Sequence, residues 1–107
     1  MGIRLFQGQG STTFSGCHFD QWDLQKRDGR AAIRAESGKL IVTGNDFAAN
    51  AWGSVPSSNH QIEIGSGVTQ AIVMGNLFAQ PRNFTLPANK GTDLQIGLNS
   101  FGTAPCA

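Results

Sequence analysis

Tyrosine is absent from this sequence, and cysteine and proline are scarce, with two and four copies among 107 residues. Charge is also sparse: eight Lys plus Arg stand against seven Asp plus Glu, for a formal net charge of +1. This balance gives no electrostatic basis for binding nucleic acid or an anionic membrane. The two cysteines, Cys17 and Cys106, form no metal-ligand pattern. The sequence therefore predicts no metal site, no cofactor and no disulfide framework.

Long apolar runs are missing as well. The first residues, Met1–Gln7, contain no apolar stretch of signal-peptide length, and no window approaches the length of a membrane span. We therefore expect no membrane association. An extracellular or virion-associated location is expected only if these residues belong to a longer protein with its own targeting signal.

Glycine is abundant, with 14 copies, and 39% of the residues are apolar, which is not the composition of a disordered chain. Seven phenylalanines carry most of the aromatic surface. Abundant glycine and asparagine with little leucine favour short strands and tight turns over helices.

A four-residue block that ends in phenylalanine recurs along the chain. Two copies read Gly-Asn-x-Phe, at 44–47 and 75–78; in the other two, Cys17 replaces Asn and Leu98 replaces Gly. The match extends upstream, so that four units begin at Ile3, Ile33, Ile62 and Phe84, spaced by 30, 29 and 22 residues. Fixed blocks at irregular spacing predict constant strands joined by variable loops.

Each unit contains two segments in which apolar residues alternate with others, which predicts strands with one buried face. The first segment has apolar outer positions and a variable centre, and the second has two inward positions. The first segments are Ile3-Arg4-Leu5, Ile33-Arg34-Ala35, Ile62-Glu63-Ile64 and Phe84-Thr85-Leu86, and the second are Thr12-Thr13-Phe14, Leu40-Ile41-Val42, Ala71-Ile72-Val73 and Leu94-Gln95-Ile96.

Stacking these units in register predicts an all-β fold, a right-handed single-stranded parallel β-helix of about four coils with three parallel sheets. One domain is expected over 1–107, alone or as a piece of a longer protein. The terminal phenylalanines then form an internal column, and Asn45, Asn76 and Asn99 form a ladder of amides between coils. A β-sandwich of antiparallel strands is the alternative, but no Asn-Gly or Asp-Gly hairpin turn joins two alternating runs.

The blocks at 33–47 and 62–78 resemble the parallel β-helix repeat of the pectate-lyase-like superfamily, which includes pectate lyases, polygalacturonases and phage tailspikes. The resemblance places the asparagine ladder in the tight turn between the second and third sheets. It also implies a protein that binds or acts on acidic or complex polysaccharides. Cys17 interrupts the ladder, so the first coil is expected near an end of the stack.

Four residues are candidates for carbohydrate binding. Arg34 and Glu63 are expected to point outward from adjacent coils, where they would bind sugar hydroxyls or carboxylates, or simply pair with each other. Trp22 and Trp52 lie in the long loops, where each would stack on a sugar ring or pack its loop onto the sheets.

Carboxylates near strand ends are the weaker, catalytic candidates. A glycosidase needs two carboxyl groups ~5–10 Å apart, and adjacent coils would bring loop acids to such distances in any β-helix. The candidates for catalysis by a polysaccharide lyase or glycoside hydrolase are Asp20, Asp23, Glu36 and Asp46.

Three apolar side chains, Ile41, Ile72 and Met74, are expected to face outward from the second sheet. An exposed apolar stripe of this kind is expected to be covered by a loop of the same chain, by another subunit or by further sequence. In the tailspikes that the repeat resembles, three β-helices bundle together. The sequence thus favours a carbohydrate-associated module, structural or polysaccharide-binding, that forms a homo-oligomer, with a trimer preferred. A polysaccharide-degrading enzyme and a self-assembling trimeric scaffold are the alternatives.

Overall fold

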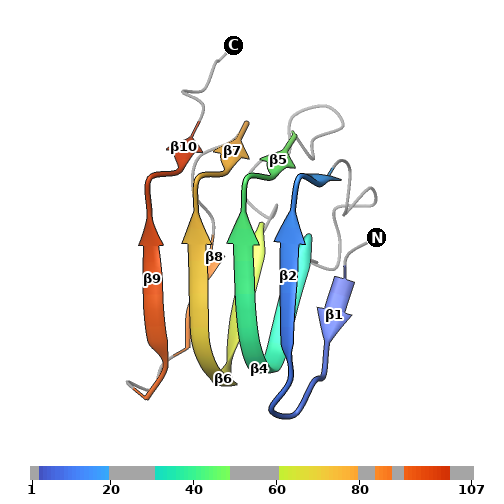
Figure 1. Ribbon diagram of the computed structural model, residues 1–107, viewed down its shortest axis with the longest axis vertical. Helices are drawn as coiled ribbons and strands as arrows, with labels where there is room; N and C mark the ends of the chain where they lie inside the picture. Colours follow the sequence, from blue (N-terminus) through green and yellow to red (C-terminus); the bar gives the residue numbers. More distant parts are fainter. Residues whose placement is uncertain (1–2, 20–30, 49–60, 80–83, 88–90, 102–107) are drawn as a thin grey trace.

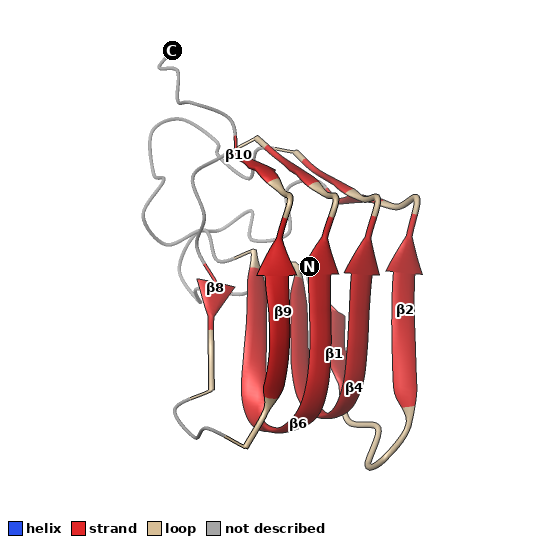
Figure 2. Cartoon of the chain, turned by 60° about the vertical axis from the view of Figure 1, so that its left-hand side comes forward, coloured by secondary structure: helices blue, strands red, loops and turns tan. Residues whose placement is uncertain are grey.

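The computed structural model describes residues 3–19, 31–48, 61–79, 84–87 and 91–101. In these ranges every regular element is a strand and none is a helix (Figure 2). Every pairing between strands of these described ranges is parallel. The predicted all-β class with parallel strands is confirmed, and the antiparallel sandwich is not found. The described part of the chain contains no helix with the length and hydropathy of a membrane span.

The strands of the described ranges form two sheets. The first holds β1 (Ile3–Leu5), β2 (Ser11–Ser15), β4 (Ile33–Thr43), β6 (Ile62–Met74), β8 (Phe84–Thr85) and β9 (Asp93–Gly97). The second holds β3 (His18–Phe19), β5 (Asp46–Phe47), β7 (Leu77–Phe78) and β10 (Ser100–Phe101). In Figure 1, β9, β6, β4 and β2 lie side by side in front, while β10, β7 and β5 form a shorter row above them.

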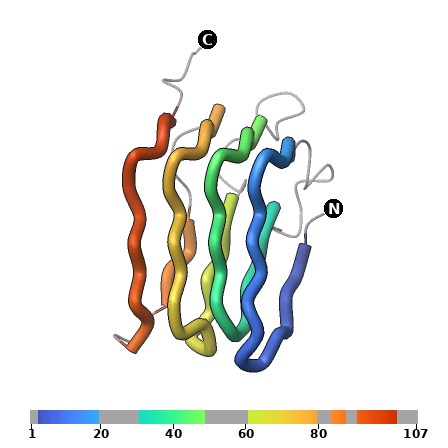
Figure 3. Tube along the Cα trace, in the orientation of Figure 1, coloured from blue at the N-terminus to red at the C-terminus, as the bar shows by residue number. Residues whose placement is uncertain are grey.

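Two long strands carry the chain through both segments of a unit, where the sequence predicts two separate strands. The first residues of β4 pair with β1 and its last residues pair with β2, so the predicted first and second sheets are joined into one. The pairing of β4 with β6 shifts register between Ala35 and Ser37 and between Gly38 and Lys39. Figure 3 shows that both strands curve round midway along their length. Gly38 has φ +84°, and a Cβ there would collide with the carbonyl oxygen of Gly10. Glycine thus allows the bend without ending the strand.

The register follows the repeat read from the sequence. Ile3 pairs with Ile33, Ile33 with Ile62, and Ile62 with Phe84. Equivalent residues of successive units therefore lie directly beside one another, as predicted. Neighbouring strands are about 4.8 Å apart, so the side chains of equivalent residues are in contact.

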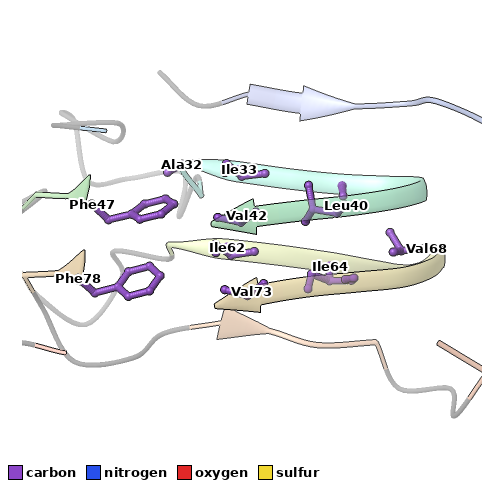
Figure 4. Close-up of a cluster of buried hydrophobic side chains, with 12 residues drawn as sticks. Ala32, Ile33, Leu40, Val42, Phe47, Ile62, Ile64, Val68, Val73 and Phe78 are labelled. Atoms are coloured by element: carbon purple, nitrogen blue, oxygen red, sulfur yellow. The ribbon is translucent and has the colours of Figure 1, made fainter. Parts of the chain in front are cut away.

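Inward-pointing side chains of β4 and β6 form the core together with Ala32, Phe47 of β5 and Phe78 of β7 (Figure 4). Phe47 and Phe78 are 1% and 2% exposed. Each stacks on its neighbour of the next unit: ring centroids are 4.6 Å apart for Phe19–Phe47, 4.6 Å for Phe47–Phe78 and 4.8 Å for Phe78–Phe101. The predicted internal column of phenylalanines is confirmed, and its spacing is that of neighbouring strands.

The asparagine ladder is confirmed as well. The backbone N and Nδ2 of Asn45 both donate to Oδ1 of Asn76, at 3.0 Å each. The same two atoms of Asn76 donate to Oδ1 of Asn99, at 3.1 and 3.0 Å. Asn45 and Asn76 are buried, so these bonds satisfy polar groups that have no access to water.

Candidate functional site

Strand alternation places one row of polar side chains on the outer face of the first segments. Arg4 pairs in register with Arg34, Arg34 with Glu63, and Glu63 with Thr85. Arg4, Arg34 and Thr85 are exposed and Glu63 is partly exposed, while the residues flanking Arg34 and Glu63 are buried. The outward direction predicted for Arg34 and Glu63 is thus observed.

Glu36 joins the two arginines of this row. Its Oε2 accepts hydrogen bonds from Nε of Arg4 at 2.8 Å and from Nε of Arg34 at 2.6 Å. Arg34 also places Nη1 at 3.4 Å from Oε1 of Glu63. We call the group Arg4, Arg34, Glu36 and Glu63 the charged row; its two positive and two negative charges balance.

The hydrogen bond from Arg4 is the main cause that lowers the pKa of Glu36 below its ordinary value. The charge and hydrogen bond of Arg34 act in the same direction, and burial opposes them. Glu36 is therefore ionised at neutral pH. A general acid needs the opposite, a raised pKa, so these contacts favour a positioning role for Glu36 over the proton donation considered from the sequence.

An aromatic ring lies at the end of the charged row. Phe6 is 70% exposed, and Cζ of Arg4 stands 4.8 Å from its ring centroid, within cation–π range. Phe6 is not among the binding residues predicted from the sequence. Its position directly after β1 and two residues after Arg4 is the signal that would have found it, because extended backbone places alternate residues on one face.

The charged row offers the chemistry of sugar recognition. A guanidinium group is a planar fork of donors that matches a carboxylate or a pair of hydroxyls. In the charged row, Nε of each arginine donates to Glu36, and Nη1 of Arg34 lies near Glu63. The terminal nitrogens of Arg4 make no hydrogen bond to the described residues. The exposed ring of Phe6 supplies an apolar face beside these donors.

Asp46 lies on the other sheet, in β5. Its Oδ2 is 3.2 Å from Nδ1 of His18, and both side chains are exposed. Asp46 and Glu36 lie on different sheets and contact different residues, Asp46 contacting His18 and Glu36 contacting the two arginines of the charged row. The other candidates from the sequence, Asp20, Trp22, Asp23 and Trp52, lie outside the described residues.

A shallow groove of about 220 Å³ runs across the outer face of the second segments. Ile41 and Ile72 are paired at its centre, with Ile72 38% exposed. Thr13 and Gln95 continue the row on either side. Polar side chains of Ser11, Lys39, Gln70 and Asp93 line the groove next to them.

Met74 pairs with Thr43 in the following row and does not line this groove. The three apolar side chains do face outward, as predicted. The apolar surface is nevertheless short, because polar residues of the outer units flank it.

No cluster of three or more potential metal ligands occurs in the part of the chain that the structure describes. Comparison with protein-family models, with curated proteins and with solved structures gives no match for this chain.

Proposed function

We propose that this chain is a portion of right-handed parallel β-helix, about four coils long and of the pectate-lyase-like kind, that serves as a non-catalytic carbohydrate-associated module. Parallel pairing in repeat register supports the β-helix, as do the phenylalanine column and the asparagine ladder. Each unit then contacts only its neighbours, as in other solenoids.

The observation that carries the binding role is the charged row beside Phe6. Arg4 and Arg34 are held in position by hydrogen bonds to one shared carboxylate oxygen of Glu36. Pre-positioned donors lose less conformational entropy when a ligand binds. Their donors and the ring of Phe6 suit a polysaccharide that carries carboxylate groups, with the carboxylate at Arg4 and a sugar face on the ring.

Calorimetric titration with an oligomeric polyuronate tests this role. The Arg4→Ala variant is expected to bind about 10- to 150-fold more weakly than the wild type, because a charge-assisted hydrogen bond to the ligand contributes about 1.5–3 kcal/mol. Lys39→Ala is the matched control, since it removes one positive charge from the other outer face and is expected to leave the affinity unchanged. Equal weakening by both variants, or no binding of any polyuronate by the wild type, would refute the binding role.

The isoleucine pair favours a second function, a self-assembling scaffold. Ile41 and Ile72 lie side by side on an outer face, which favours contact with another copy of this chain, with a trimer preferred. Light scattering on the wild type and on Ile72→Lys tests it, with Thr13→Lys as the control for added charge on the same row. An identical mass for wild type and Ile72→Lys would refute the scaffold function.

A further inference from the structure

The asparagine ladder has a direction. In each rung the backbone N–H and the side-chain Nδ2 donate to Oδ1 of the asparagine in the following unit. Nδ2 also donates to a main-chain carbonyl of the preceding unit: Phe14 for Asn45 at 2.9 Å, and Val42 for Asn76 at 2.9 Å. The backbone N–H thus points toward the next unit, Nδ2 donates in both directions, and Oδ1 accepts, among the described residues, only from the preceding unit.

This direction makes the two ends of the ladder different. In the first unit, the backbone N of Cys17 donates to Oδ1 of Asn45 at 2.9 Å, but a cysteine has no Oδ1 to offer to a unit before it. In the last unit, Nδ2 of Asn99 donates to the carbonyl of Val73 at 3.0 Å. No Oδ1 among the described residues accepts from the backbone N–H or Nδ2 of Asn99, although such an acceptor is present for both earlier rungs.

Apolar side chains of the last unit are also less covered than those of the unit before it. The inward residues of the last unit are partly exposed, whereas their register partners one unit earlier are at most 2% exposed. The pairs are Phe84 with Ile62, Leu94 with Ala71, Ile96 with Val73, and Phe101 with Phe78. In Figure 1, β9 and β10 accordingly have a strand neighbour on one side only.

We propose that the edge formed by β9 and β10 binds an extended segment of a partner polypeptide that carries its own Asn-x-Phe turn. The segment pairs parallel to β9, its asparagine Oδ1 accepts from Asn99, and its phenylalanine stacks on Phe101. Addition of a strand to an open edge supplies main-chain hydrogen bonds, and the asparagine and phenylalanine supply selectivity. The opposite end, at Cys17, does not offer the same chemistry. This inference is independent of glycan binding by the charged row.

A peptide of residues 39–48 is the probe, because it contains the second segment, turn and phenylalanine of one unit. Titrated into the ¹⁵N-labelled chain, it is expected to shift the backbone amide and the side-chain NH₂ of Asn99 most, followed by resonances of β9 and β10. The same peptide with Asn45→Cys mimics the first unit and is the control. It is expected to bind at least about fivefold more weakly, since two neutral hydrogen bonds are lost.

Three results would overturn the proposal. One is the absence of saturable shifts at about 1 mM peptide, where even weak strand addition is detectable. Another is equal affinity for the two peptides, or shifts centred on β1, β2 and β3. The third is a shift of the Asn99 resonances with the concentration of the chain alone, which would make a second copy the occupant of this edge.

Discussion

The inner and outer units of the molecule share one design but differ in burial. Phe47 and Phe78, in the inner units, are 1% and 2% exposed, while Phe19 and Phe101, in the outer units, are partly exposed. Yet the stacking distances along the column differ by only 0.2 Å, from 4.6 to 4.8 Å. Contact geometry is therefore set by the repeat, whereas burial requires a neighbour on both sides. In a stack of this kind, stability is expected to depend on the number of neighbours a unit has.

The phenylalanine column gives the largest contrast between inner and outer units. Phe78→Ala is expected to lower the free energy of unfolding by about 3–5 kcal/mol, because it leaves a cavity between two stacked rings. Phe101→Ala removes a ring that is partly exposed and is expected to lower it by about 1–2 kcal/mol. Urea denaturation monitored by circular dichroism measures both. Equal losses would contradict the dependence on neighbours.

The ladder gives the next contrast. Asn76→Ala removes the acceptor of two Asn45 donors and leaves the buried backbone N–H of Asn45 without that acceptor, so a loss of about 2–4 kcal/mol is expected. Asn99→Ala removes the same acceptor for Asn76, but at a partly exposed position where water replaces it, and about 1–2 kcal/mol is expected. Thermal unfolding checks the order. A larger loss for Asn99→Ala would show that the last rung is buried in solution.

The turns provide a smaller contrast. Gly75 has φ +70° in an inner unit, and Leu98 has φ +55° at the equivalent position of the last unit, with its side chain 88% exposed. A left-handed conformation costs a non-glycine residue about 1–2 kcal/mol. We expect Gly75→Ala to destabilise by about 1 kcal/mol and Leu98→Gly to stabilise by about 0.5 kcal/mol. The same unfolding curves measure both, and destabilisation by Leu98→Gly would mean that Leu98 makes contacts in solution.

Glu36 connects an outer unit to an inner one through its hydrogen bonds with Arg4 and Arg34. Its substitution is expected to change the free energy of unfolding least. Glu36→Gln is expected to lower the free energy of unfolding by about 0.2–1 kcal/mol at pH 7, as is usual for exposed ion pairs. The pKa of Glu36 is lowered from 4.5 in the folded state. Its contribution is therefore complete above 4.5, the ordinary pKa of a glutamate side chain, and is lost as the pH falls through the lower folded value.

Urea midpoints at pH 7 and at pH values below the folded pKa of Glu36 measure this difference between wild type and Glu36→Gln. The two proteins should differ at pH 7 and converge in acid. A difference that is independent of pH would mean that the glutamine disturbs packing and that the ion pairs contribute nothing.

Much of the fold could be predicted from the sequence because the repeat carries its own register. Aligning Ile3, Ile33, Ile62 and Phe84 predicts the strand partners that the structure shows. The column and the ladder follow, since equivalent residues of parallel neighbours must meet. The continuous course of β4 and β6 was not predicted, because glycines such as Gly38 suggest a break between segments. Whether a glycine ends a strand or bends it depends on the neighbouring backbone, which a local pattern does not contain.

The candidate site was predicted only in part. Arg34 and Glu63 were found because strand alternation fixes their direction. The shared role of Glu36 was missed, since it depends on the side-chain conformations of Arg4 and Arg34 rather than on spacing. The contact of Arg4 with Phe6 was missed for the same reason.

Methyl NOE spectroscopy on the side chains of the two inner units tests the parallel stacking most directly. Parallel pairing in repeat register places Leu40 beside Ala71 and Val42 beside Val73. We expect strong cross-peaks for those two pairs, because paired side chains have Cβ atoms about 5 Å apart. Strong cross-peaks of Leu40 with Val73 and of Val42 with Ala71 in their place would demonstrate antiparallel pairing and contradict the stacking of equivalent units.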